Sequence, residues 1–509
     1  MPSRGLFLLL LVVAVRAAPF HVDPTTQHII DEFGRTRLFH GLNAVYKIPP
    51  WHPELEGFDA QNSFSEIDAQ NLVSWGFNHV RLGVMWPGVQ PTSTTTDTEY
   101  LNTMGRMIDL LHSYNISTLV DCHQDILSRK LCGEGAPDWA ISTTNGLAFS
   151  HPSAHKFTVD PVTQYPDLKD CLSHPFFVYY MSDQACLASQ HLYNNTGILQ
   201  DKFVEYWSSV VAALKGHEGV MGYELLNEPW PGDIYTNPLL IGLSGYADKH
   251  NLVPMYRRLH EAIRRIDTDH MIFFEPAVTD YWTSGFQEGP GGKEYNDRQV
   301  YSYHIYCSLD TNRTDPRSKT VCKGEDSESW ATRKKDIKRL GCGSFLTEFG
   351  ASTDHSIAIH ELNYMGNQAD KYMENWDYWQ FKYFQDLTTA DALEGFYDSN
   401  GNLEVSKVRA LSRTFAPAIA GVPVSMAFDP ETALYNLKYN PNPAAKGPTE
   451  IYLNEAWYYP HGFDVTITPP GAAQWAKVAT NRIEVTHTAA SRGTTVQITI
   501  TPVAAAATV

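Results

Sequence analysis

The chain has 509 residues, 43% of them hydrophobic and 12% aromatic, and only 19% are charged. This composition excludes an intrinsically disordered chain, and the length predicts a large domain with a smaller companion. The formal net charge of −18 provides no long-range attraction to nucleic acid or to an anionic membrane surface. We therefore expect a neutral or weakly charged substrate and no nucleic-acid partner.

The N-terminus has the pattern of a secretory signal peptide. Arg4 precedes an apolar run over 6–15, and Ala17 places a small residue where signal peptidase cleaves. The alternative, a membrane anchor, needs about 20 apolar residues, and this run is shorter. We predict cleavage after Ala17, which removes 1–17, and we expect no transmembrane segment elsewhere in the chain.

Passage through a secretory lumen also agrees with three N-glycosylation sequons, although such triplets often arise by chance. They lie at Asn115, Asn194 and Asn312. The predicted location is therefore extracellular, or a digestive or lysosome-like lumen.

Seven cysteines without C-x₂-C spacing favour disulfides over a zinc site in an oxidising compartment. The plausible bridges are Cys307 with Cys322 and a pair drawn from Cys132, Cys171 and Cys186. The odd count leaves one thiol unpaired, and Cys122 is the candidate because it stands in an apolar strand pattern. The pattern leaves the connectivity open.

From residue 38 onward, short β-rich runs alternate with longer amphipathic stretches, as in parallel β/α units. The predicted strands are 38–44, 79–84, 117–123, 220–228, 271–275, 300–306, 344–350 and, less clearly, 377–381. The helix-like stretches between them include 64–75, 100–114, 201–215 and 252–267. Together they favour a closed (β/α)₈ TIM barrel. An open doubly wound sheet is the alternative, but no G-x-G-x-x-G or P-loop string marks a nucleotide site.

Two segments depart from this alternation. A long insertion, about 126–195, follows the third strand, and barrel loops of that length usually shape or cover a site. Near the C-terminus, segments such as G-F-D-V-T-I-T-P-P alternate apolar and polar residues, which indicates antiparallel strands. We predict a barrel domain over 18–417 and an antiparallel β-sandwich domain over 418–509.

Two glutamates at predicted strand ends are the candidates for catalysis. Glu228 stands in L-L-N-E-P-W-P-G after the fourth strand, and Glu348 stands in F-L-T-E-F-G in the seventh. The C-terminal ends of barrel strands carry the active site, and retaining hydrolysis of a glycosidic bond needs two carboxyl groups about 5 to 5.5 Å apart. The alternative for each is a solvated surface carboxylate. N-E-P alone is also a weaker signal, since a lone glutamate before proline is often only a helix start.

The two motifs, in this order, resemble the clan of retaining barrels that includes glycoside hydrolase family 5. Further strings over 41–47 (G-L-N-A-V-Y-K), 120–125 (V-D-C-H-Q-D) and 378–382 (Y-W-Q-F-K) are similar to the endoglycoceramidases. The resemblance covers the barrel, and the sandwich-like tail matches in kind. It implies Glu228 as acid/base, Glu348 as nucleophile, and hydrolysis between the oligosaccharide and the ceramide of a glycosphingolipid. This two-carboxylate mechanism requires no metal or other cofactor.

Further polar and aromatic residues at the strand ends are candidates for substrate binding. They are Lys47, His123, Asp125, Asn227, His304, Tyr306 and Trp379. Asn227 could donate to the sugar 2-hydroxyl, and the alternative is a helix cap. His304 and Tyr306 could hydrogen-bond Glu348 and the substrate. Arg81 could support the nucleophile by lowering its pKa, or could form an internal ion pair of the barrel.

The remaining candidates depend more on the resemblance. His123 and Asp125 could bind sugar hydroxyls, or be a satisfied histidine and a capping aspartate. Trp379 could stack on a sugar face or only pack in the core. Lys47 resembles the family's contact to the reducing-end sugar or lipid head, although lysines on loops are mostly solvated.

A ceramide would also need an apolar channel near Glu228. The candidate aromatics are those of the insertion together with Trp51, Trp230, Tyr281 and Trp282, and ordinary loop packing explains them equally well. A lipid-presenting activator or a detergent-like amphiphile is a possible partner. The rival functions are an endo-β-glucanase, a glucosylceramidase-like β-glycosidase, or a catalytically silent glycan- or lipid-binding protein.

Overall fold

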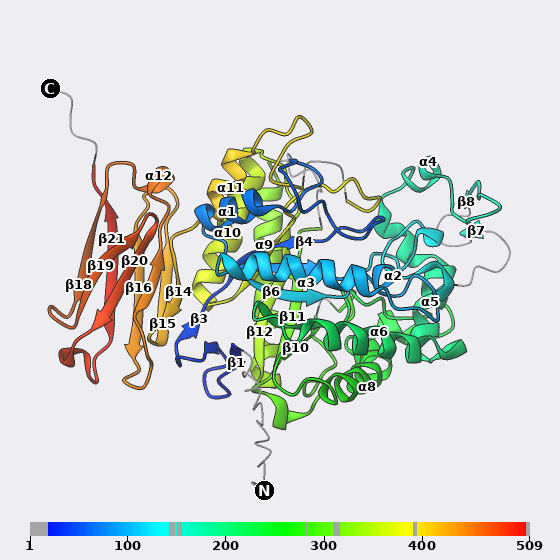
Figure 1. Cartoon of the computed structure of the whole chain (residues 1–509), viewed down its shortest axis with the longest axis horizontal. Coiled ribbons are helices and arrows are strands. Elements are labelled where there is room, and N and C mark those ends of the chain that lie inside the picture. Colours follow the sequence, from blue (N-terminus) through cyan, green and yellow to red (C-terminus); the bar gives the residue numbers. More distant parts are fainter. Residues whose placement is uncertain are drawn as a thin grey trace, which may run out of the picture.

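Eight parallel strands close into a barrel at the centre of the molecule (Figure 1). They are β4 (His40–Ala44), β5 (His79–Gly83), β6 (Ser117–Asp121), β9 (Val220–Glu224), β10 (Met271–Phe274), β11 (Gln299–Ile305), β12 (Gly343–Gly350) and β13 (Trp376–Trp379). Both faces of these strands are buried, which explains why the sequence shows near-continuous apolar runs here. All the predicted barrel strands are confirmed. This computed structural model describes residues 19–141, 148–149, 155–280, 282–308, 316–389 and 394–504. The predicted signal peptide, Tyr281 and Asn312 lie outside the described residues.

Helices surround the barrel and confirm the predicted helical stretches to within a few residues. The longer ones are α1 (Glu66–Trp75), α3 (Thr98–Ser113), α6 (Leu199–Leu214), α8 (Val253–Arg264), α9 (Ser318–Leu340) and α10 (Ser356–Tyr372), and shorter ones are α2 (Trp86–Val89), α7 (Leu239–Gly242) and α11 (Val405–Leu411). In α3, the Asp97 side chain caps the N-terminus by accepting from two backbone N–H groups. Leu101, Met104, Ile108 and Leu111 recur at helical spacing and are buried.

The N-terminal strands cover the end of the barrel at which the barrel strands begin. These strands are β1 (Phe20–Val22), β2 (Ile29–Asp31) and β3 (Thr36–Arg37). Phe20 and Val22 pack in one buried cluster with barrel residues such as Met221 and Met271. Because β3 pairs with β14, the first strands also extend the C-terminal sheet.

Two antiparallel sheets form the C-terminal domain, at the left of Figure 1. The first has the order β1-β2-β3-β14-β17-β20-β19 and the second β15-β16-β21-β18. The strands are β14 (Phe415–Ile419), β15 (Gly421–Phe428), β16 (Tyr435–Pro441), β17 (Thr449–Tyr452), β18 (Phe463–Thr468), β19 (Ala473–Ala479), β20 (Arg482–His487) and β21 (Val496–Pro502), with the short helix α12 (Glu455–Tyr458). Alternate residues of β16 and β21, such as Leu437 and Ile498, meet in their core. This confirms the predicted β-sandwich.

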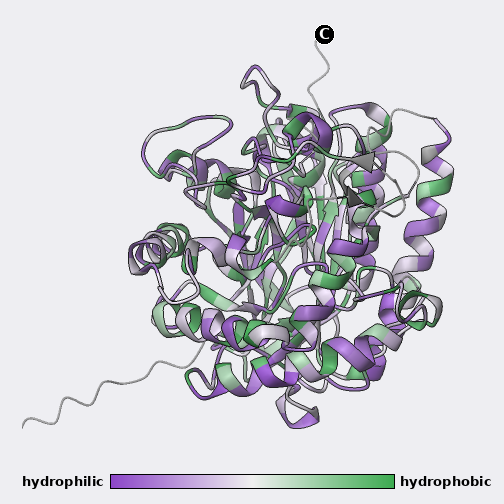
Figure 2. Ribbon diagram, turned by 90° about the vertical axis from the view of Figure 1, so that its right-hand side faces the viewer, coloured by the Kyte–Doolittle hydropathy of each residue, from purple (hydrophilic) through white to green (hydrophobic). Residues whose placement is uncertain are grey.

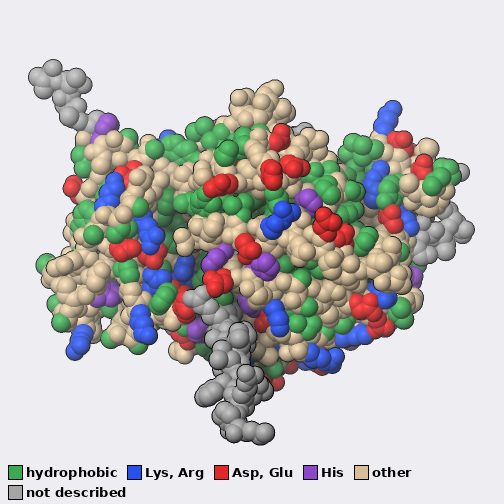
Figure 3. All heavy atoms as spheres, in the orientation of Figure 1, with side chains coloured by type: hydrophobic (Ala, Val, Ile, Leu, Met, Phe, Trp, Pro, Cys, Tyr) green, Lys and Arg blue, Asp and Glu red, His purple; other side chains and the backbone are tan. Residues whose placement is uncertain are grey.

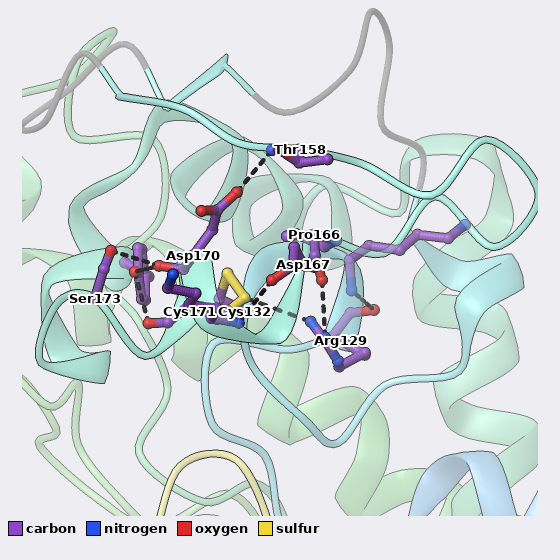
Figure 4. Close-up of a disulfide and its surroundings, with 12 residues drawn as sticks. Arg129, Cys132, Thr158, Pro166, Asp167, Asp170, Cys171 and Ser173 are labelled. Carbon is purple, nitrogen blue, oxygen red and sulfur yellow. Dashed lines mark hydrogen bonds between the residues drawn. A yellow bond between two sulfur atoms is a disulfide. The ribbon is translucent and has the colours of Figure 1, made fainter.

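The insertion after β6 contains α4 (Leu168–Cys171), α5 (Asp183–Tyr193) and the short strands β7 (Ala148–Phe149) and β8 (His155–Lys156). A disulfide joins Cys132 to Cys171 and fastens the start of the insertion to α4 (Figure 4). Beside it, Arg129 donates to the Pro166 carbonyl at 2.8 Å. The disulfide and this hydrogen bond therefore join the start of the insertion to its middle part.

The predicted Cys307–Cys322 bridge is confirmed, and Cys122 is free and buried. The expectation of a single unpaired thiol is wrong, because Cys186 and Cys342 are also free and buried. Cys186 lies in α5 of the insertion, whereas Cys342 precedes β12 at the opposite end of the barrel. Since the two lie at opposite ends of the domain, they cannot pair.

The outer surface mixes residue types. Figure 2 looks onto the side that carries the insertion and shows hydrophilic and hydrophobic segments interleaved along the outer helices. On the face shown in Figure 3, acidic and basic side chains are interspersed. Within the described parts of the chain, no helix is both long and apolar enough to cross a bilayer.

Candidate active site

All the residues predicted for the site come together at the mouth of the barrel. β4 leads into Lys47, β5 carries Arg81, and β6 leads into His123 and Asp125; β9 leads into Asn227 and Glu228, β11 carries His304 and leads into Tyr306, and β12 and β13 carry Glu348 and Trp379. Contacts between neighbouring side chains connect every member of this set. Parallel strands of a barrel end at one face, so the strand-end positions converge there.

Glu228 and Glu348 face each other across His304. One ligand atom from each of the three residues lies within 4.8 Å of the other two. This places the two carboxyl groups close enough for a retaining double displacement. The Glu228 side chain is 17% exposed and the Glu348 side chain 6%, so both carboxyl groups are largely shielded from water.

The same trio has the donor atoms of a metal site. However, Glu348 already accepts hydrogen bonds from Arg81 (2.6 Å) and from the Tyr306 hydroxyl (2.9 Å). With one oxygen on a guanidinium and the other on a phenol, this carboxylate is held in place, and both of its oxygens already have donors where a cation would need them free.

Arg81 is fully buried and bonds Glu348 together with three other polar side chains. Its guanidinium donates to Asn43 (2.9 Å), Asn227 (2.8 Å), Glu224 and Glu348. Burial raises the pKa of Glu348 above its usual value, and the charges of His304 and Arg81 oppose that rise. Burial also lowers the pKa of His304 to about 4, so at neutral pH the opposing positive charges are those of Arg81 and His123. Arg81 therefore forms ion pairs inside the barrel and also lowers the pKa of Glu348, so the two alternatives are compatible.

Glu228 has the environment of a proton donor. Burial, followed by the charge of Asp125, raises its pKa to about 7. His304 Nδ1 lies 2.8 Å from Glu228 Oε1, whereas Arg81 bonds Glu348 directly. The proton is therefore favoured on Glu228 and the negative charge on Glu348, as an acid/base and nucleophile pair requires.

His123, Asp125 and Trp379 line the neighbouring part of the mouth. The His123 ring stacks on Trp379 with centroids 5.0 Å apart, and its Nδ1 lies 2.7 Å from Asp121. Burial would lower the pKa of His123, but Asp121 and Asp125 raise it to about 9. A protonated imidazolium and a carboxylate thus stand side by side as donor and acceptor.

Lys47 differs from a solvated loop lysine. It is 1% exposed, and its ammonium contacts Asp125 (2.8 Å) and Thr388 (2.6 Å) beneath the Trp379 ring (4.9 Å). Burial lowers its pKa, but Asp125, Asp386 and Glu134 together raise it well above the usual value. Lys47 therefore joins the loops after β4, β6 and β13, and its direct contact with substrate stays a prediction.

Sequence reasoning missed four residues that complete the site. Glu275 accepts the Glu228 backbone N–H, and Gln124 donates to the Asn227 and Glu228 carbonyls. Both were accessible to the strand-end rule, since Glu275 ends the predicted 271–275 strand and Gln124 stands between His123 and Asp125. Glu224 of β9 and Asp121 of β6 both pair with Arg81 of β5 inside the barrel, where neighbouring strands bring them together, and Asp121 also contacts His123 two residues further along.

The aromatic candidates for a lipid channel divide into different environments. Trp230 is buried, stacks on Tyr180 and donates to the Cys186 sulfur, so it packs the loop. Trp51 is partly buried against the cluster that contains Trp379. Trp282 is 69% exposed.

Comparisons with known proteins agree with this geometry. Residues 54–385 match the model of cellulase (glycosyl hydrolase family 5), and residues 413–500 match the glycoside hydrolase family 5 C-terminal domain. The chain is 36% identical to an endoglycoceramidase of Cyanea nozakii, over 94% of this chain and 93% of that protein. It is also 36% identical to an endoglycoceramidase of Hydra vulgaris, over 92% and 88%.

Among solved structures, the chain resembles endo-glycoceramidase II from Rhodococcus sp. in its ganglioside GM3 complex. The TM-score is 0.73 at 21% identity, over 94% of this chain and 99% of that chain. The similarity in fold thus extends through the barrel and the C-terminal sheets.

Proposed function

Because the chain belongs to glycoside hydrolase family 5, we propose that it is a retaining endo-β-glycosidase that hydrolyses the linkage between the oligosaccharide and the ceramide of glycosphingolipids. The proposed reaction is supported mainly by one observation: one polar side-chain atom from each of Glu228, His304 and Glu348 lies within 4.8 Å of the other two. The choice of substrate is supported by the 36% identity to endoglycoceramidases over nearly the whole chain. The products are an intact glycan and ceramide.

The reaction proceeds in two displacements. Glu348 attacks the anomeric carbon while Glu228 gives its proton to the glycosidic oxygen, so the C–O bond breaks and ceramide leaves as the alcohol. In the second step the Glu228 carboxylate takes a proton from water, whose oxygen attacks the same carbon and releases Glu348. Arg81 and Tyr306 hold the two oxygens of Glu348 throughout.

The substrate is oriented by groups that the fold has already fixed. The Asn227 Oδ1 accepts from Arg81, and its Nδ2 donates one hydrogen to the Gln124 carbonyl at 3.0 Å. The second Nδ2 hydrogen donates to the sugar 2-hydroxyl. His123 and Asp125 bind further hydroxyls, and Trp379 supplies the stacking surface. His304 contacts both glutamates and the substrate between them.

The biological setting is part of the same proposal. A signal peptide and the sequons at Asn115 and Asn194, both on exposed residues, support secretion and glycosylation. A substrate that is embedded in a lipid surface supports a requirement for a detergent-like amphiphile or an activator that presents the lipid.

The substrate assay separates this proposal from its rivals. Purified protein is incubated with a ganglioside and, separately, with a soluble β-glucan, and the products are identified by mass spectrometry. Intact oligosaccharide plus ceramide is the expected result. Release of monosaccharide would indicate an exo-acting glucosylceramidase-like enzyme, and cleavage of the glucan alone would indicate an endo-β-glucanase.

The nucleophile is tested with Glu348→Gln. We expect turnover of ganglioside to fall by about 10³-fold or more while the thermal transition is retained. Glu205→Gln, at a 53% exposed side chain of α6, is the matched control and should leave turnover unchanged. Full activity in Glu348→Gln would remove this residue as the nucleophile.

A further inference from the structure

The backbone of Glu228 has an unusual conformation. Its φ is +39°, in the left-handed region that residues with a side chain rarely adopt. β9 has already ended at Glu224, so the ladder of the barrel does not impose this angle. Such a conformation persists only where surrounding groups determine it.

Two side chains hold the Glu228 backbone in this conformation, one from the side of each neighbouring strand of the barrel. β9 lies between β6 and β10. From the β10 side, Glu275 Oε2 accepts the Glu228 N–H at 2.8 Å. From the β6 side, Gln124 Nε2 donates to the carbonyls of Asn227 (2.8 Å) and Glu228 (3.0 Å). The peptide groups on both sides of the Glu228 Cα are thus held by side-chain hydrogen bonds, and we call this pair of contacts the grip.

Both gripping residues are themselves fixed and shielded from water. Gln124 is buried, and its Oε1 accepts the Leu127 N–H at 2.9 Å. Glu275 is buried, and its backbone carbonyl accepts the Tyr256 hydroxyl of α8 at 3.0 Å. Because water has little access to either, solvent would not readily replace a lost hydrogen bond.

We propose that Glu275 and Gln124 are positioning residues that hold the Glu228 backbone in its left-handed conformation and so aim the carboxyl toward the glycosidic oxygen. This inference depends on the proposed role of Glu228 as acid/base. Without the grip, relaxation of φ rotates the side chain away from His304 and Glu348. The consequence is a selective loss of proton transfer, with the nucleophile left in place.

The choice of leaving group separates this role from a general effect on folding. Without a proton, ceramide would have to leave as a poorly stabilised alkoxide, whereas dinitrophenolate is stable enough to leave unprotonated. We compare Glu275→Leu and Glu275→Gln on ganglioside and on a dinitrophenyl β-lactoside, and follow the first turnover of the latter by stopped flow.

For Glu275→Leu we expect kcat/KM on ganglioside to fall roughly 10- to 100-fold, because small misplacement of a catalytic group has such effects. The first release of dinitrophenolate should stay within about threefold of the unmodified protein. Glu275→Gln keeps an oxygen that can accept the Glu228 N–H and should restore most of the ganglioside activity. Equal losses on both substrates, or no loss on ganglioside, would overturn the proposal.

Gln124→Leu tests the other half of the grip and should show the same selectivity. Gln200→Leu is its matched control, since the buried Gln200 also donates to two backbone carbonyls, of Leu192 and Tyr193, but outside the site. Gln200→Leu should not distinguish between the two leaving groups. A selective loss in this control would show that the effect is not specific to the grip.

The premise is tested separately with Glu228→Ala. Loss of ganglioside turnover, retained release of dinitrophenolate and acceleration by azide would establish the acid/base role. If Glu228→Ala shows this pattern and Glu275→Leu does not, only the positioning role fails. If Glu228→Ala lacks it, the acid/base assignment and the positioning role fail together.

Discussion

At the scale of single residues, the site divides charge between two chemically identical side chains. Arg81 bonds Glu348, while burial and the nearby Asp125 raise the pKa of Glu228 to about 7. The protonated form of Glu228 is the active one in the first step, so activity requires a pH below that pKa. Ionised Glu348 is required as well, which sets the acidic limit.

We therefore predict that kcat/KM on ganglioside falls as the pH rises through about 7. Asp125→Asn removes a negative charge that raises the pKa of Glu228, so the basic limb should move to lower pH. The measurement is the pH dependence of kcat/KM, fitted for the basic limb alone. Asp160→Asn, at a solvent-exposed residue of the insertion, is the control and should not move the limb. An unchanged limb in Asp125→Asn would contradict this account.

At the scale of elements, loops rather than strands shape the mouth of the barrel. The insertion after β6 carries Glu134, which accepts from the Leu387 N–H in the loop after β13 at 2.9 Å. The Cys132–Cys171 disulfide begins two residues before Glu134 and closes a sequence separation of 39. The bridge thus stabilises the start of the insertion, where Glu134, together with Asp125 just before the insertion, contributes to the acidic surroundings of Lys47.

Removing this bridge with Cys132→Ser/Cys171→Ser should loosen the insertion. Loop-closure entropy assigns such a bridge about 4 kcal/mol as an upper value. We expect faster proteolytic cleavage between residues 132 and 171 and a higher KM, with kcat less affected. Limited proteolysis and steady-state kinetics provide the measurement. Cys342→Ala, which removes a buried free thiol, is the control; equal cleavage rates in all three proteins would refute the prediction.

At the scale of the whole molecule, the sandwich is joined to the barrel through a buried interface. His40 of β4 stacks between Trp376 of β13 and Phe415 of β14. Nearby, Arg413 donates to Asp370 of α10 at 2.7 Å and to the Phe428 carbonyl of β15 at 3.0 Å. One guanidinium therefore connects a barrel helix to a strand of the sandwich.

Arg413→Met should lower the free energy of unfolding by about 3 to 5 kcal/mol, because it leaves the Asp370 carboxylate buried without its partner. Adding Asp370→Asn removes that charge and should recover part of the loss. Chemical denaturation provides the measurement. Arg257→Met breaks a pair whose side chains are 54% and 36% exposed and should cost at most about 1 kcal/mol. Similar losses at both positions would contradict the role of burial.

Much of this protein was predictable from local pattern. Barrel strands buried on both faces leave apolar runs, and catalytic groups at their ends leave motifs such as N-E-P and T-E-F-G. The barrel strands, the four predicted helices, the sandwich and the convergence of Glu228 with Glu348 follow from signals a few residues long. The Cys307–Cys322 bridge was one plausible pairing, and the structure confirms it. The roles assigned to the site residues stay predictions until the variants above are measured.

What only the tertiary structure decided concerns contacts between distant segments. Lys47 reads as an ordinary loop lysine, yet Asp125, Asp386 and Thr388 surround it once three loops meet. Glu275 and Gln124 stand at predicted strand ends, but their hydrogen bonds to the Glu228 backbone could not be predicted, because those bonds depend on β6, β9 and β10 lying side by side. Sequence determines where strands end, and the closure of the barrel determines which side chains meet. Burial there raises the pKa of both glutamates, and the charge of Asp125 near Glu228 and the bond from Arg81 to Glu348 distinguish the two.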